Sequence, residues 1–479
     1  MPTASPEQAS LGATKSSLEL LIERNATTFA QVKRFNERWQ GDARFRARFE
    51  SDQRGTLAAY QLDLHPEDVR HIWDASASLE KQDTNQRVQP SLVAQCLQEL
   101  AASLEDAPKP VEVLEEEIDN GLNDRRYRAW RKRQVYRLRS QTVKTLYEDT
   151  GHFSCAFELS QGCSVGCWFC SLSAGKLESV YPYSIENSRD WQQLLQMLKC
   201  KLGPAVGESF CYWATDPLDN PDYERFADDF AAILGKFPQT TTAQAAKHPE
   251  RVRTLLKTAE NKGGHVRFSV TSLSALNKIH TEFTPTELLR TELVLQLEGS
   301  LTGKKSNAGR ARDAGGKNPQ LKTNTSDDTT PSCVSGFIIN MASRRISLVS
   351  PCLPNERWIH GHRIHDEAHF KNTEDLALII ESLIGKHMPV QLSPVERIRF
   401  RPDLSYQELE HGFRLSTKFK HFTFRKHSKA KNLGSLIQAG THTAGEITAM
   451  LLTGYRVPMA ETWRQLSILF DYGFLDDEA

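Results

Sequence analysis

Short strand-like segments alternate with amphipathic helical segments from about residue 151 to about residue 297. The segment 153–159, FSCAFEL, has apolar side chains at every second position and predicts a strand with Phe153 and Phe157 on one face. The segment 188–204 places apolar residues on one helical stripe and ends at a Gly-Pro pair. Such repeated units predict a parallel sheet or barrel with helices outside. In these folds the reacting groups gather at the carboxyl ends of the strands.

The sequence on either side of this alternation predicts further regions. Residues 1–105 carry apolar residues at helical spacing and predict an N-terminal helical domain. Residues 106–150 combine an acidic linker with a basic helix. The alternating region extends over 151–390 and contains a long polar loop, 299–332, which is either functional or disordered. Residues 391–479 combine hairpin-like segments with short helices, which is compatible with a small C-terminal winged-helix-like α+β domain.

The basic helix that precedes the alternating region carries aromatic residues among its arginines and lysines. Tyr127, Trp130 and Tyr136 are spaced so that they either pack on the next domain or form a peptide-binding surface. The sequence favours neither reading.

Composition narrows the class of protein. The chain has 479 residues with 60 Lys+Arg and 60 Asp+Glu, so its global charge does not favour nucleic acid or an anionic membrane as a partner. It shows neither a secretory signal nor a transmembrane stretch, and we expect a cytoplasmic protein. In a reducing compartment cysteines bind metal, catalyse or fill a core more often than they form disulfides.

Three of the nine cysteines are closely spaced in QGCSVGCWFCSLSAG, residues 161–175. Cys163, Cys167 and Cys170 follow directly after the first strand of the alternation. Clustered thiolates bind zinc or an iron–sulfur centre. A closed zinc site needs four ligands, and neither a histidine nor a fourth cysteine lies at zinc-finger distance. A [4Fe–4S] cluster held by three cysteines leaves one iron open for a substrate or cofactor.

This CxxxCxΦC motif resembles that of the radical S-adenosylmethionine (SAM) superfamily. The resemblance implies a partial (β/α)6 TIM-like barrel in which SAM chelates the open iron. One-electron reduction then yields a 5′-deoxyadenosyl radical that abstracts hydrogen from the substrate, while the protein orients the substrate and shields the radical. A reductant protein such as flavodoxin or ferredoxin is implied as a partner.

The resemblance also assigns SAM contacts to this chain. Phe169 precedes the last cysteine of the motif. After the second strand the superfamily has a Gly-Gly-Glu-like turn, and here WATDPLDNPDY stands instead, so that Thr215 and Asp216 take that part. The remaining expected contacts lie near the ends of the third, fourth and fifth strands: Gln244, Ser269, Thr271 and Gln296. A polar residue that only makes a local hydrogen bond is an equally good reading of each of these four.

Several segments together are similar to the radical SAM peptide epimerases of proteusin type. These segments are ELSQGCSVGCWFC, YWATDPLDNPDY, GRAR and SPCLPNERW. The similarity covers about residues 120–370. It implies an isomerase that converts L-residues to D-residues in a ribosomally synthesised precursor peptide. The adenosyl radical removes a Cα hydrogen and a cysteine thiol returns one to the opposite face.

The other cysteines were compared as that hydrogen donor. Cys352 ends the strand-like segment RISLVSPC between two prolines, where a rigid turn at the mouth of a barrel could fix its side chain, and it is preferred over Cys333. We expect Cys96, Cys155 and Cys200 to be buried core thiols. No cysteine follows Cys352, which argues against auxiliary clusters.

Two regions are candidates for binding the leader of the precursor peptide. The C-terminal domain loosely resembles winged-helix recognition elements, which add the leader as an extra strand. Residues 29–73 resemble the leader regions of proteusin precursors. A plain structural role is at least as good a reading of each region.

Two other functions stay open at this stage. One is a different radical SAM peptide modification, such as crosslinking or methylation. The other is a non-catalytic peptide-binding protein that carries a structural metal.

Overall fold

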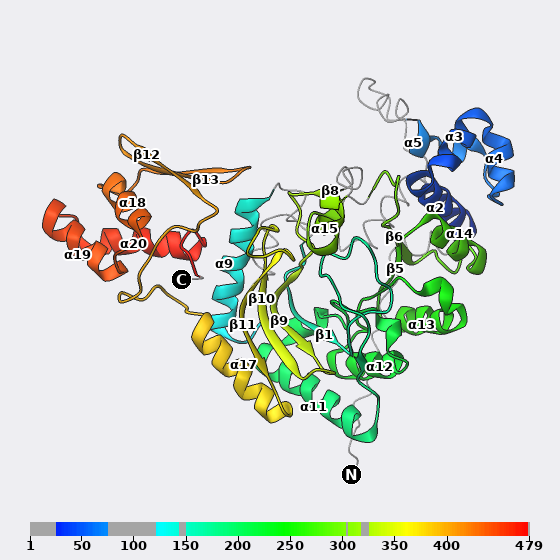
Figure 1. The fold of residues 1–479 in the computed structure, drawn as a ribbon, viewed down its shortest axis with the longest axis horizontal. Coiled ribbons are helices and arrows are strands. Elements are labelled where there is room, and N and C mark those ends of the chain that lie inside the picture. Colours follow the sequence, from blue (N-terminus) through cyan, green and yellow to red (C-terminus); the bar gives the residue numbers. More distant parts are fainter. Residues whose placement is uncertain (1–24, 75–120, 143–149, 303–304, 318–324, 478–479) are drawn as a thin grey trace, which may run out of the picture. The chain divides into compact units, whose positions relative to one another are not determined.

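The computed structural model describes residues 25–74, 121–142, 150–302, 305–317 and 325–477 (Figure 1). These residues divide into two compact units. The first contains 25–74 and 270–302, and the second contains the rest. Within the described residues no helix is long and apolar enough to cross a membrane.

The first unit is mainly helical. Its helices are α2 (Ala26–Gly41), α3 (Ala43–Ser51), α4 (Gln53–Ala59), α5 (Arg70–Trp73) and α14 (Leu273–Glu282), and its strand is β6 (Thr291–Leu295). Phe35 packs edge to face on both Phe45 and Phe49, which stack on each other, at the centre of a buried apolar cluster. The Asp42 carboxylate accepts hydrogen bonds from the first amides of α3 at 2.9 and 3.1 Å, so α3 begins directly after α2 ends. Residues 29–73 therefore form a folded unit with its own core.

The second unit contains a series of parallel strand pairings. β1 (Phe153–Glu158) bridges to Phe210, which bridges in turn to Gln239 at the start of β4 (Thr240–Thr242), and β4 pairs with β5 (Val266–Val270). The helices α11 (Ile185–Leu202), α12 (Tyr223–Leu234) and α13 (Pro249–Asn261) connect these strands in sequence order. Because consecutive strands are parallel, their carboxyl ends meet at one edge.

α11 shows why the sequence forms these connecting helices. Its apolar stripe is fully buried, and the Trp191 ring packs edge to face on Phe157 of β1 at 5.1 Å. Ser184 caps its amino end by accepting a hydrogen bond from the Asn187 amide at 3.0 Å. Gly203, with φ of 92°, ends it. The helical stripe expected over 188–204 is confirmed.

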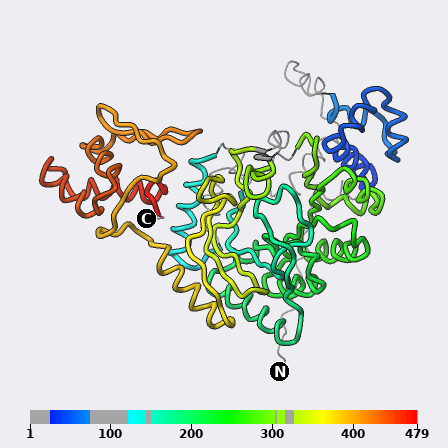
Figure 2. The backbone as a smooth tube through the Cα atoms, viewed as in Figure 1, coloured from blue at the N-terminus to red at the C-terminus, as the bar shows by residue number. Residues whose placement is uncertain are grey.

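A second set of strands flanks β1 on its other side. β9 (Val334–Asn340) pairs in parallel with β1, and β10 (Arg345–Pro351) and β11 (His362–His369) follow as antiparallel neighbours. Figure 2 shows how the chain returns after about 180 residues to place β9 beside β1. A register shift between Phe153 and Cys155 turns Phe153 toward the cluster of Ala156 and Phe210. The prediction that Phe153 and Phe157 share one face is therefore wrong, because the bulge interrupts the alternation.

The fold class is α/β, as predicted. Several small sheets are present, and the described strands do not close into a barrel. The region expected as a long loop, 299–332, contains a short helix in its described part, α15 (Gly309–Lys317). It also contains the paired strands β7 (Lys305–Ser306) and β8 (Thr325–Ser326).

The basic helix α9 (Arg125–Gln141) packs its aromatic residues inside the second unit. Tyr127 and Trp130 are buried, and the Tyr127 hydroxyl donates toward the Ser154 and Ser335 carbonyls at 3.1 and 2.8 Å. Tyr136 stacks on Tyr472 at 4.8 Å. The packing interpretation of this helix is the one observed.

The C-terminal segment forms a three-stranded sheet followed by three helices. The strands are β12 (Ser405–Leu409), β13 (Gly412–Ser416) and β14 (His421–Phe424), and the helices are α18 (Ala430–Ala439), α19 (Ala444–Tyr455) and α20 (Met459–Asp471). Phe413 and Leu433 lie in its continuous apolar core. Arg401, whose side chain is fully buried, donates to the Gly473 carbonyl and to the Ser140 hydroxyl of α9, both at 2.9 Å.

Candidate functional site

The three cysteines lie on a loop that leaves the carboxyl end of β1. Its base is a two-residue ribbon, in which β2 (Ser160–Gln161) pairs with β3 (Ser179–Val180). The Cys163 amide donates to the Gly175 carbonyl at 2.9 Å and closes the loop. Gly162 has φ of 78°, and a Cβ atom there would lie 2.0 Å from the Lys176 carbonyl oxygen. Only glycine fits at this crossing.

Inside the loop the cysteines are half-buried. The Cys170 amide donates to the Cys167 carbonyl at 3.3 Å, and the Ser173 amide donates to the Cys170 carbonyl at 3.1 Å. The Ala174 amide points at the Cys170 Sγ at 3.4 Å. An amide donor at a cysteine sulfur stabilises a thiolate ligand and tunes an iron–sulfur centre.

Burial raises the pKa of two of the thiols. The pKa of Cys163 rises to about 11, with the charges of Asp216 and Asp219 adding to the effect of burial. The pKa of Cys167 also rises to about 11, because burial and the neighbouring Cys170 outweigh the opposing charge of Arg310. Both thiols are therefore protonated at neutral pH unless a metal displaces the protons.

The donor set distinguishes two kinds of metal centre. In the described part of the chain, no three His, Cys, Asp or Glu side chains are grouped so that they could hold one metal ion. A closed zinc site requires such a group. In a [4Fe–4S] cluster each cysteine binds a different iron, so the sulfurs stand farther apart. The loop offers three partly exposed thiols, one of them facing an amide donor, as the donor set that such a cluster would need.

A polar network lies where the parallel strands end, beside this loop. Asp219 accepts hydrogen bonds from the Ser164 amide at 2.8 Å, the Ser164 hydroxyl at 2.5 Å and the Gln244 side-chain amide at 2.8 Å. Asp216 accepts from the Thr242 hydroxyl and the Ala243 amide, both at 2.8 Å. The network joins the cysteine loop to the ends of the second and third strands of the series.

The structure brings some of the predicted SAM contacts together within the second unit, while others belong to the first unit. Asp216 is buried, and burial raises its pKa although its hydrogen bonds oppose the shift. Gln244 joins the same network, and Thr215 and Ser269 are half-buried in the same unit. Thr271 and Gln296 belong to the other unit.

Two acidic residues of this region were missed in the sequence. Asp219 makes the direct contact to the cysteine loop, and its signal was a second carboxylate in TDPLDN. Glu158 ends β1 and is buried, where its carboxylate accepts from the Ala214 amide at 2.8 Å and the Asn340 side chain at 3.0 Å. Burial raises the pKa of Glu158. A glutamate at the end of a largely apolar strand was the available signal.

The aromatic pair beside the last cysteine has a cation over it. Trp168 and Phe169 pack edge to face at 5.5 Å. The Lys305 Nζ atom lies 5.5 Å from the Trp168 ring and 5.2 Å from the Phe169 ring. These are cation–π distances, so Lys305 helps to fix the rings next to Cys170.

The two candidate hydrogen donors lie at the ends of neighbouring strands. Cys333 precedes β9 and packs against the apolar cluster of Ala156, Phe210 and Val349, and burial raises its pKa to about 12. Cys352 follows β10, is buried, and donates its amide to the Gly361 carbonyl at 3.0 Å. The printed pairing of β9 with β10 ends with Gly336 opposite Val349, so both cysteines lie beyond its last pair, at the edge where β9 begins.

The position of Cys352 differs from the expected mouth of a barrel. β10 follows β9 through a tight turn, and a connection that short makes the two strands antiparallel. β10 therefore ends at the edge where β9 begins, whereas the cysteine loop leaves β1 at the opposite edge. The segment after Cys352 nevertheless returns to the loop, because His360 contacts the Ser171 carbonyl at 3.1 Å.

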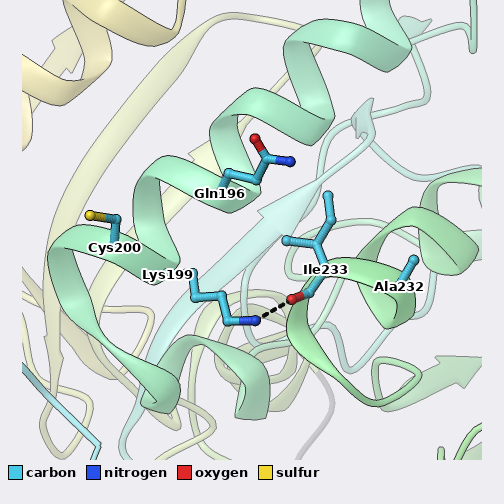
Figure 3. Close-up of a pocket in the computed structure, with 5 residues that line it drawn as sticks. All are labelled: Gln196, Lys199, Cys200, Ala232 and Ile233. Carbon is cyan, nitrogen blue, oxygen red and sulfur yellow. Dashed lines mark hydrogen bonds between the residues drawn. The ribbon is translucent and has the colours of Figure 1, made fainter. Parts of the chain in front are cut away.

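The other cysteines are divided between core and surface. Cys155 and Cys211 are buried. Cys200 is exposed, so the expectation of a core thiol is wrong there, because it lies outside the buried stripe of α11. It borders a surface pocket of about 420 Å³ between α11 and α12, which contains no predicted site residue (Figure 3). Cys96 lies outside the described residues.

Comparisons with known proteins identify relatives of this chain. Residues 398–460 match the family model described as the protein y4wI C-terminal domain. The chain is 33% identical over 429 residues to a protein of Sinorhizobium fredii (strain NBRC 101917 / NGR234) described as uncharacterized protein y4wI, covering 88% of this chain and 82% of the relative. No solved structure matches. Since the similarity extends over most of both chains, this protein belongs to the y4wI family.

Proposed function

We propose that this protein is a radical SAM enzyme that epimerises L-residues to D-residues in a ribosomally synthesised precursor peptide. The observation that carries the proposal is the spacing of Cys163, Cys167 and Cys170 on a loop at the carboxyl end of β1, the first strand of a parallel strand–helix series. That series of β1, Phe210, β4 and β5 supports a partial barrel as the underlying fold.

In this proposal the three cysteines hold a [4Fe–4S] cluster and leave one iron for SAM. Bound SAM, once reduced through the cluster, supplies the 5′-deoxyadenosyl radical. The chain's own residues position and shield the reactants. The hydrogen-bonded pair of Asp219 and Gln244 lies beside the loop and would position polar groups of the reactants. The Phe169 ring, with Lys305 over it, lies next to Cys170 and would shield them from water.

A thiol then returns hydrogen to the substrate. The S–H bond of Cys352 breaks as a C–H bond forms at the inverted carbon, which leaves a sulfur radical. One electron from a reductant of the flavodoxin or ferredoxin class and one proton from solvent restore the thiol. What supports Cys352 is the segment that follows it, since His360 contacts the Ser171 carbonyl of the cysteine loop at 3.1 Å although β10 itself ends at the other edge of the sheet. Cys333, directly before the neighbouring strand β9, is the alternative donor.

The C-terminal domain is the proposed docking site of the leader. In the described sheet, β14 pairs with β13 on one side and has its other edge open. The residues that follow it, Arg425 and Lys426, are exposed. An open edge beside basic side chains suits an extended acidic segment that adds as a fourth strand.

Anaerobic turnover with reductant, SAM and a precursor peptide in D₂O tests the reaction. We expect one deuterium at each inverted residue. Cys352→Ala should still cleave SAM but yield no D-residue, and Cys333→Ala, the matched control, should retain epimerisation. If Cys333→Ala yields no D-residue while Cys352→Ala retains epimerisation, Cys333 is the donor.

The same assay separates the rival functions. A product whose mass changes in H₂O indicates crosslinking or methylation instead of epimerisation. A colourless, zinc-loaded protein that leaves SAM intact indicates a non-catalytic peptide-binding protein.

A further inference from the structure

Helix α15 contacts the cysteine loop from a position 136 residues away in the sequence. The Arg310 amide donates to the Cys170 carbonyl at 3.0 Å, and the Arg310 guanidinium donates to the Ala174 carbonyl at 3.0 Å. These two bonds bracket the segment 170–174, which contains the last cysteine. One residue thus fixes both ends of that segment.

Gly309 makes this close approach sterically possible. Its φ is 48°, and a Cβ atom there would lie 2.3 Å from the Ser171 carbonyl oxygen and 2.7 Å from the Ser173 hydroxyl. The Gly309 amide donates to the Ile359 carbonyl at 3.0 Å, which ties α15 to the segment that follows Cys352. A larger residue at this position would push the loop away.

His360 contacts the middle of the same segment from another part of the chain. Its Nδ1 atom lies 3.1 Å from the Ser171 carbonyl oxygen. A carbonyl oxygen only accepts hydrogen bonds, so Nδ1 carries the hydrogen in this contact. The His360 ring is nearly parallel to the His362 ring, with the two centroids 6.2 Å apart.

We propose that Arg310 and His360 are positioning residues that clasp the segment 170–174 and hold the three-cysteine loop in the shape that binds its cluster. This assignment rests on the proposed function. Three carbonyls, those of Cys170, Ser171 and Ala174, are held by groups from outside the loop. Partners that orient metal ligands in this way contribute about 10- to 100-fold to metal affinity or activity.

The test uses the full chain with three changes and two matched controls. Arg310→Ala removes the guanidinium contact, His360→Phe removes the ring donor, and Gly309→Ala inserts a methyl group against the loop. Arg312→Ala is the control on α15, since Arg312 contacts the Asn355 carbonyl instead of the loop. Gly299→Ala has similar backbone strain, with φ of 78°, but no neighbour within 4 Å.

Two measurements test the contacts of Arg310 and His360 without depending on catalytic turnover. Hydrogen exchange of residues 163–175 in the metal-free protein reports loop order without a cluster. We expect faster exchange in the three test variants and unchanged exchange in both controls. After anaerobic reconstitution, we expect the test variants to bind iron about tenfold or more weakly than the controls. His360→Asn, which keeps a donor near Nδ1, should restore binding.

Unchanged loop exchange and iron affinity in Arg310→Ala and His360→Phe would overturn the clasp. If the parent protein binds no iron–sulfur cluster while the exchange results hold, the proposed function fails and the loop contacts stand as structural only. Failure of the clasp therefore appears in the variants, as unchanged exchange and iron affinity, whereas failure of the proposed function appears in the parent protein, as the absence of a cluster.

Discussion

The cysteine loop and the C-terminal domain are stabilised in opposite ways. The loop has little regular structure, and hydrogen bonds from residues such as Asp219 and Arg310, distant in sequence, hold it in place. The C-terminal domain forms its sheet and helices from 405–471 and buries a continuous apolar core. Long-range polar contacts therefore shape the candidate site, while apolar burial within one short stretch shapes the domain.

The largest expected effect comes from removing one cysteine of the loop. In Cys167→Ala, a [4Fe–4S] cluster loses one of three protein ligands, so we expect loss of nearly all bound iron and of SAM cleavage. Iron analysis and assay of 5′-deoxyadenosine measure both. The matched control Cys200→Ala changes an exposed thiol on α11 and should retain both. Full iron binding by Cys167→Ala would contradict the three-cysteine site.

The second effect concerns the core of the C-terminal domain. Phe413 is fully buried and packs on Phe424 at 4.8 Å, so Phe413→Ala should lower the free energy of unfolding of this domain by about 3–5 kcal/mol. Denaturant titration followed by hydrogen exchange of 405–475 measures the loss. Leu452→Ala, at a position that is 40% exposed, is the control and should change stability little.

Iron binding should stay unchanged in Phe413→Ala under conditions where the sheet of β1, β9, β10 and β11 remains folded. If this core variant also lost its iron, the loop and the domain would not be stabilised independently.

The third and smallest effect is a pH dependence of the free energy of unfolding. It comes from two buried histidines at the sheet of β1, β9, β10 and β11. Burial lowers the pKa of His152 to about 3 and that of His362 to about 4, below the value of about 6.5 in unfolded chains. The unfolded state then binds more protons, so stability is fully present above pH 6.5 and falls as the pH is lowered toward these values. Lowering the pH from 6.5 to 5 should decrease the free energy of unfolding by about 2 kcal/mol for each of these two histidines.

Thermal unfolding monitored at pH 7 and pH 5 checks this prediction. In His362→Gln the pH dependence should be weaker than in the parent protein, whatever its stability at pH 7. An unchanged slope would show that His362 does not carry the effect.

The sequence was informative where local rules dominate. The helical stripe of α11 and the hairpin of β13 and β14 follow from periodicity, which depends on neighbouring residues alone. The cysteine motif was visible because its three residues lie within one loop. For the same reason its placement after β1 could be predicted.

The periodicity of the sequence could not predict which strands pair when they lie far apart in the chain. The sequence did not indicate that β9 lies parallel to β1, since that contact joins residues about 180 positions apart. The antiparallel β10, which moved Cys352 to the other edge, depends on the turn after Asn340. Asp219 was missed because only the folded chain brings it to Ser164.

The cluster itself is the central claim and can be measured directly. Protein purified without oxygen should contain about four iron and four sulfide per chain and absorb broadly at about 400 nm. Adding SAM to the reduced protein should change its electron paramagnetic resonance spectrum, because SAM occupies the open iron. A colourless protein that contains zinc, or an iron centre whose spectrum is indifferent to SAM, would contradict the account.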